Sequence, residues 1–190
     1  MSGLVTKPVL ENFLRRVSSG FGDRGSVYLI GETSQVWETW RSWTPKIELT
    51  SVVPDHRRFA RALSDVMREM DLNVIDEFPG DLIPLPEGYE RRSRPITAFG
   101  GLDIRHFDPY STAYRFIARG DEPDYHLVLS YVHHGWIDID EMNERLDALL
   151  PRFSMDTIQQ DPAEFRRKYK GLMQMARSIV PGSIHRHTPV

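Results

Sequence analysis

Cysteine is absent from this sequence of 190 residues, and long apolar runs are absent as well. Without cysteine the chain can form no disulfide, and thiolate metal sites and thiol nucleophiles are excluded. No apolar run approaches the roughly 18 residues of a membrane span, and the opening residues MSGLVTKPVL lack the apolar core of a signal peptide. We therefore expect a cytoplasmic protein without a membrane partner.

An excess of charge of one sign is lacking too. The 24 basic and 27 acidic residues give a formal net charge of -3, so the composition provides no strong signal for nucleic-acid binding. The hydrophobic fraction of 40% and the charged fraction of 27% are typical of globular rather than disordered proteins. Lysine is scarce among the basic residues and occurs only at Lys7, Lys46, Lys168 and Lys170.

The apolar pattern predicts strands mixed with helices in the first half and almost only helices in the second. Strands are expected at residues 26–30, 46–53, 73–76 and 102–107, and helices at 6–18, 33–41, 55–70, 109–119, 122–134, 138–150 and 162–178. The stretch between Phe78 and Pro95, rich in proline, glycine and charge, is expected to be a long loop that serves as a lid or a partner surface. This pattern predicts an α+β fold with a small mixed β-sheet and a helical C-terminal part.

We expect one domain over residues 1–180. Its strand–helix core extends to about residue 107, its helical part covers about 108–180, and residues 181–190 form a flexible tail.

One segment has the character of a binding site. A predicted strand ends at Gly31, a helix follows at once, and the next strand begins with Lys46 and Glu48. Residues two apart in a strand share a face, so Lys46 and Glu48 are expected to point the same way. The helix start after Gly31 exposes backbone N–H groups that favour anions.

This arrangement resembles the nucleotidyltransferase fold, in which a strand ends in a Gly-Gly or Gly-Ser turn and Asp-x-Asp lies on the next strand. The resemblance is closest to small bacterial nucleotidyltransferases related to AbiEii-type toxins. It covers residues 13–167 and includes Gly31-Glu32-Thr33, Phe107-Asp108-Pro109-Tyr110, Arg119-Gly120 and Asp124. It implies a nucleotidyltransferase-like fold, and for active relatives magnesium-dependent transfer of a nucleotidyl group to RNA or protein, in a toxin–antitoxin or defence setting.

The sequence departs from the family pattern at the residues that carry the chemistry. Glu32 stands at the second turn glycine, Lys46 at the first metal-binding aspartate and Glu48 at the second. Magnesium prefers hard oxygen ligands, and both acids normally position the ions of two-metal transfer. A lysine at position 46 reverses the charge where a cation is expected. We therefore predict a catalytically degenerate protein with a binding or regulatory role and no required cofactor.

Two further departures lie in the helical part, where Phe116 replaces a family lysine and Leu127 replaces the second of two aspartates, while Asp124 keeps the first. For the active-site segment, one hypothesis is that the Lys46 ammonium takes the place of the metal and pairs with Glu48 or Glu32. The alternative is that the sequence of this surface has diverged without any specific pairing of Lys46.

Two other functions stay open. An active magnesium-dependent transferase would use Glu48, Asp103 and Asp124 as catalytic carboxylates, with Glu48 as a metal ligand. Its nucleotide site would comprise Gly31, Glu32, Thr33, Arg41 and Lys46. A protein-interaction module would need no nucleotide at all.

The remaining motifs favour structural roles. Asp138-Ile139-Asp140 is a literal Asp-x-Asp, but Asp138 with Glu141 is typical of a helix start. His133-His134 precedes Gly135, where a helix end is favourable for histidine.

Overall fold

The computed structural model describes residues 3–153 and 161–179, and the chain divides into two compact units. The first unit is built from the described residues of Met1–Asp81 and Leu85–Thr112, the second from Leu82–Pro84 and the described residues of Ala113–Val190. The tail expected at residues 181–190 lies outside the described residues.

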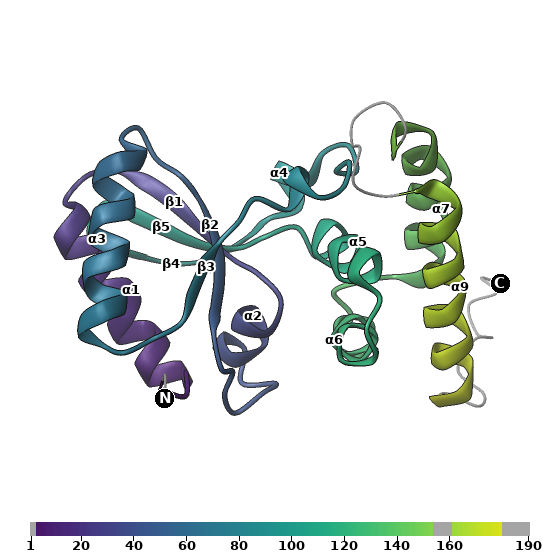
Figure 1. Ribbon diagram of the computed structural model, residues 1–190, viewed down its shortest axis with the longest axis horizontal. Coiled ribbons are helices and arrows are strands. Elements are labelled where there is room, and N and C mark those ends of the chain that lie inside the picture. Colours follow the sequence, from purple (N-terminus) through teal and green to yellow (C-terminus); the bar gives the residue numbers. More distant parts are fainter. Residues whose placement is uncertain (1–2, 154–160, 180–190) are drawn as a thin grey trace, which may run out of the picture. The chain divides into compact units, whose positions relative to one another are not determined.

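The first unit contains all the strands. Its elements are α1 (Lys7–Phe21), β1 (Gly25–Leu29), α2 (Glu32–Trp37), β2 (Ile47–Val52), α3 (His56–Glu69), β3 (Val74–Asp76), a 3-10 turn at Pro79–Asp81, α4 (Tyr89–Arg92), β4 (Arg94–Phe99) and β5 (Leu102–His106). The strands form one sheet (Figure 1), and hydrogen bonding between neighbours gives the order β3-β2-β1-β5-β4. β1 is antiparallel to β2 and parallel to β5, so the sheet is mixed.

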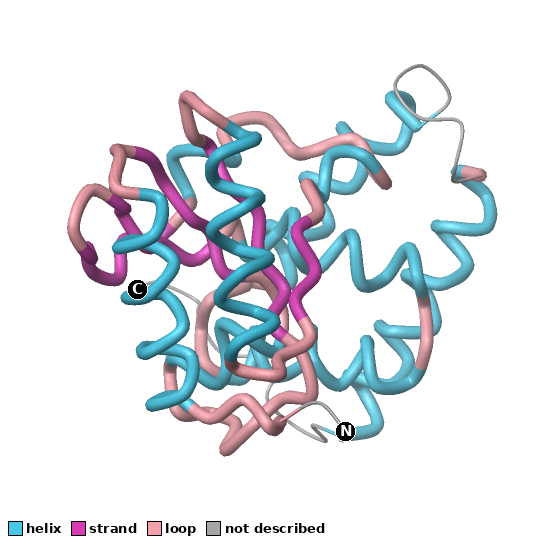
Figure 2. Tube along the Cα trace, turned by 60° about the vertical axis from the view of Figure 1, so that its left-hand side comes forward, coloured by secondary structure: helices cyan, strands magenta, loops and turns pink. Residues whose placement is uncertain are grey.

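Helices α1 and α3 cover one face of this sheet (Figure 2). Their apolar residues recur at helical spacing and pack on Val27, Leu29 and Leu49, so burial of these side chains drives the association of sheet and helices. Phe21 and Phe59 meet edge to face with ring centres 5.4 Å apart. The alternate residues of β2, Glu48 among them, point to the opposite face.

The second unit is helical. After α5 (Pro109–Arg119), which begins in the first unit, it contains α6 (Glu122–His133), α7 (Ile139–Leu149), a 3-10 turn at Leu150–Arg152 and α9 (Pro162–Ile179). Tyr114 donates a hydrogen bond to the carbonyl oxygen of Met142 at 2.5 Å, and Phe153 packs on Phe165 with ring centres 4.7 Å apart. No helix in the described part of the chain is long and apolar enough to cross a membrane.

The α+β fold with a small mixed sheet and C-terminal helices is confirmed. Two local predictions are wrong. The helix expected at residues 33–41 ends at Trp37, because Thr39 adopts a left-handed conformation (φ 64°) that no α-helix continues through. The loop expected between Phe78 and Pro95 contains α4, and its end belongs to the unpredicted edge strand β4.

Candidate functional site

The candidate site lies where β1 ends. Gly31 follows this strand with φ 60°, a conformation that glycine adopts without the steric cost other residues meet. The Ile30 amide donates to the Glu48 carbonyl oxygen at 3.0 Å, which places Glu48 directly beside the turn. The Glu48 amide in turn donates to Thr33 Oγ1 at 2.7 Å. Thr33 therefore ties the start of α2 to β2.

Lys46 and Glu48 form an ion pair at this position. The Lys46 Nζ atom lies 3.1 Å from Glu48 Oε1, and the carboxylate side chain is 3% exposed while the lysine is 24% exposed. Of the two alternatives left open by the sequence, the structure shows the pairing of Lys46, and its partner is Glu48. A buried carboxylate requires a compensating cation, and here a side chain of the protein supplies it.

Glu32, the second residue of the turn, has partners of its own. It accepts a hydrogen bond from Thr44 Oγ1 at 2.7 Å and pairs with Arg41 at 3.0 Å. Arg41 also donates from Nε to the Trp43 carbonyl oxygen at 2.8 Å. The acid and the arginine expected to meet a nucleotide phosphate are thus engaged with each other. The Thr33 amide is likewise engaged, since it donates to the Ile30 carbonyl oxygen at 3.2 Å.

Asp103 is not brought together with Glu48. In the pairing of β1 with β5, Asp103 lies opposite Ser26, whereas Glu48 is bonded to Ile30, which is four residues after Ser26 and directly follows β1. At about 3.3 Å per residue the two acids are separated by ~13 Å along the strands. Asp103 is exposed, at the other end of the sheet.

Asp124 lies in the second unit, where its contacts stabilise the start of α6. Its carboxylate accepts from Arg119 Nε at 2.8 Å, and it forms a reciprocal capping box with Asp121 at the start of α6. Such a box satisfies backbone N–H groups that the first helical turn leaves without partners. The side chain is buried.

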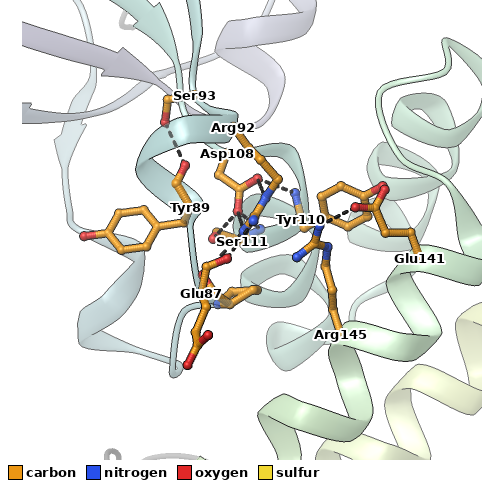
Figure 3. Close-up of polar contacts among 10 residues, drawn as sticks. Glu87, Tyr89, Arg92, Ser93, Asp108, Tyr110, Ser111, Glu141 and Arg145 are labelled. Carbon is orange, nitrogen blue, oxygen red and sulfur yellow. Dashed lines mark hydrogen bonds and ion pairs between the residues drawn. The ribbon is translucent and has the colours of Figure 1, made fainter.

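Asp108, which was not predicted as a site residue, belongs to this end of the sheet. β5 ends beside the turn, because the Phe107 amide donates to the Leu29 carbonyl oxygen at 2.9 Å. The Asp108 side chain is fully buried and pairs with Arg92, with Nε at 2.8 Å and Nη2 at 2.9 Å (Figure 3). It also accepts from the Ser111 hydroxyl at 2.6 Å and the Ser111 amide at 3.1 Å. In the sequence, Asp108 is followed by proline at a predicted helix start, and this pattern could have indicated its position.

His106 is a second buried ionisable group that sequence reasoning missed. It pairs with Leu29 across β1 and β5 and is 2% exposed. Its Nε2 atom lies 2.8 Å from Glu38 Oε1. Burial lowers the pKa of the imidazole from 6.5 to about 4, outweighing the raising effect of Glu38, so the neutral ring donates to the carboxylate at neutral pH.

The residues present do not fit a magnesium ion. Octahedral coordination needs several oxygen ligands converging on one point, whereas Glu48 faces an ammonium and Asp108 faces a guanidinium. Within residues 3–153 and 161–179 no group of three histidines or acids is arranged to hold a metal. Asp138 instead caps α7 by accepting from the Glu141 amide at 2.9 Å, as predicted.

The Lys46–Glu48 pair leads to a stability prediction. Lys46→Met is expected to lower the free energy of unfolding by about 2 kcal/mol, because it leaves a buried carboxylate without its cation. Urea unfolding measures the change. The double variant Lys46→Met/Glu48→Gln should recover most of the loss, since a neutral amide needs no counter-ion. An equal loss in the single and double variants would contradict the pairing argument.

The comparisons with known proteins identify no family. The chain matches no protein-family model. No curated protein sequence is similar to it. The crystal structure of an antigenic nucleotidyltransferase-like protein from Paracoccidioides brasiliensis is similar over 93% of each chain, with a TM-score of 0.43 and 12% sequence identity.

Proposed function

We propose that this protein is a nucleotidyltransferase-fold protein whose metal site is degenerate, and that it acts by binding rather than by phosphoryl transfer. The observation that carries the proposal is the position of the Lys46 ammonium, 3.1 Å from Glu48 Oε1. The resemblance puts the two metal-binding acids at these two residues. One is now a cation that neutralises the other.

A magnesium ion would have to break this pair before it could bind. Separating a buried carboxylate from its cation costs several kcal/mol. The displaced ammonium would then stand next to the incoming ion and repel it. Glu32 and Arg41, where the resemblance expects nucleotide phosphates, are paired with each other at 3.0 Å and would have to separate before Arg41 could bind a phosphate. Each of these effects opposes the binding of a magnesium–nucleotide complex.

The active alternative, with Glu48, Asp103 and Asp124 as its carboxylates, receives less support. Asp103 and Glu48 lie at opposite ends of the sheet, which argues against one shared ion. Asp108 follows the end of β5 at the same end of the sheet as Glu48, and Arg92 neutralises it. Both buried acids at this end of the sheet are therefore matched by basic side chains.

Calorimetry with ATP or GTP and magnesium chloride tests the proposal. We expect no magnesium-dependent heat with the natural protein, and no change in the titration after Glu48→Gln. The matched variant Lys46→Asp/Glu32→Gly restores the charge pattern of the family and serves as the positive arm, in which weak magnesium-dependent binding is expected. Magnesium-dependent binding by the natural protein that Glu48→Ala abolishes would overturn the proposal.

A further inference from the structure

A groove between α1 and α3 lies on the face of the sheet opposite Glu48. It has a volume of about 560 Å³, and small residues line it where the two helices approach. A Cβ atom built on Gly20 would lie 3.4 Å from the Ala62 Cβ, so a larger side chain at position 20 would crowd the facing helix. Ser19 and Gly20 are both exposed, which leaves the backbone of α1 open to a ligand.

Arginines give one end of this groove a positive charge. Arg58 and Arg61 line it, and Arg57 lies on the same first turns of α3. All three are exposed, and within the described residues no carboxylate lies within ion-pair distance of any of them. The Arg58 guanidinium lies over the Phe21 ring, 5.9 Å from its centre, which restricts its orientation.

The other end of the groove carries acids that already have partners. Asp65 pairs with Arg68 at 3.6 Å, and Glu69 pairs with Arg16 of α1. The uncompensated charge of the groove is therefore positive and confined to the N-terminal half of α3. A ligand lying along it would place its acidic groups at that half.

We propose that this groove docks an acidic segment of a partner protein. Carboxylates on such a segment would pair with Arg57, Arg58 and Arg61, while its remaining residues pass over Ser19 and Gly20. This binding site is separate from the region around Gly31 and does not depend on the loss of catalysis there.

A polypeptide fits these features better than a nucleic acid does. A phosphodiester backbone that continued along the groove would run onto Asp65 and Glu69. Among the described residues no aromatic side chain lines the groove, so bases would find no stacking partner there.

Fluorescence anisotropy tests the proposal on the full chain at low salt, with a labelled peptide that carries glutamates at one end and uncharged residues along the rest. The groove variant is Arg57→Gln/Arg61→Gln, which leaves Arg58 on Phe21 and so spares the packing of α3. The matched control is Arg166→Gln/Arg167→Gln, which removes the same charge from two exposed arginines of α9. Thermal unfolding of both variants verifies that they fold.

We expect the groove variant to bind the peptide about tenfold more weakly than the natural protein, and the control less than about twofold more weakly. An equal loss in both variants would show attraction to charge alone and would overturn the proposal. So would the absence of peptide binding by the natural protein. Tighter binding of a labelled oligothymidylate, weakened by the groove variant, would assign the groove to nucleic acid instead.

Discussion

Arg92→Ala is expected to lower the free energy of unfolding by ~3–5 kcal/mol, because it leaves a fully buried carboxylate without its cation. Asp108 accepts two hydrogen bonds from the Arg92 guanidinium (Figure 3), and in the natural protein its side chain is 0% exposed. Arg92 also donates to the Glu87 carbonyl oxygen at 2.7 Å, which holds the segment before α4. Urea unfolding monitored by circular dichroism measures the loss.

Three further variants separate this interpretation from a general effect of removing arginine. Arg91→Ala removes the neighbouring, exposed arginine and should change stability by less than about 0.5 kcal/mol. Arg92→Lys should give an intermediate loss, since lysine keeps the charge but not the two-pronged geometry. Arg92→Ala/Asp108→Asn should recover part of the loss. If Arg92→Ala unfolds at the same urea concentration as the natural protein, the Arg92–Asp108 pair does not stabilise the fold.

The helices were the most predictable part of this fold, since their signals are local. Asp55 accepts from the Arg58 amide at 3.0 Å at the start of α3, and aspartate is a preferred residue at a helix N-cap. The apolar stripe of α3 then packs on the sheet as its spacing predicted. A cap and a stripe lie within a few residues of each other, so no knowledge of distant contacts is needed.

Strand β4 could not be recognised in the same way. Arg94, Pro95, Thr97 and Ala98 are exposed, and only Phe99 at its end is buried, so the strand shows no apolar alternation. Its register also shifts between Pro95 and Thr97. Proline and a bulge are typical of edge strands, where they discourage further pairing. β4 forms because it pairs with β5, and this pairing cannot be read from the sequence of β4 alone.

The candidate site was predictable only over short distances along the chain. Lys46 and Glu48 share a face because strand side chains alternate, and their pairing follows from two residues of spacing. The partner of Asp108 lies 16 residues away, and the partner of His106 lies 68 residues away. The separation of Asp103 from Glu48 depends on the register between strands. These relations are properties of the assembled sheet.

His106 is expected to make stability fall as the solution is acidified from pH 6.5 towards pH 4. The pKa of the buried imidazole is about 4, against 6.5 for the exposed group, so the unfolded chain binds a proton over this range while the folded chain does not. The stability that the neutral ring contributes is complete above pH 6.5 and lost as the pH falls. At 1.36 kcal/mol per pH unit, the loss amounts to about 3 kcal/mol.

The groups around His106 define the control for this prediction. Glu38 accepts its hydrogen bond, while Arg94 and Lys7 oppose its protonation. His106→Gln keeps a donor for Glu38 but has no titration in this range, so it isolates the histidine from carboxylates that titrate elsewhere. Urea midpoints at pH 7.5, 6 and 4.5 should diverge between natural protein and variant, with the natural protein losing more stability. Parallel pH dependence of the two would contradict the prediction, since it would mean that the folded ring gains its proton near pH 6.5 and that Glu38 offsets the effect of burial.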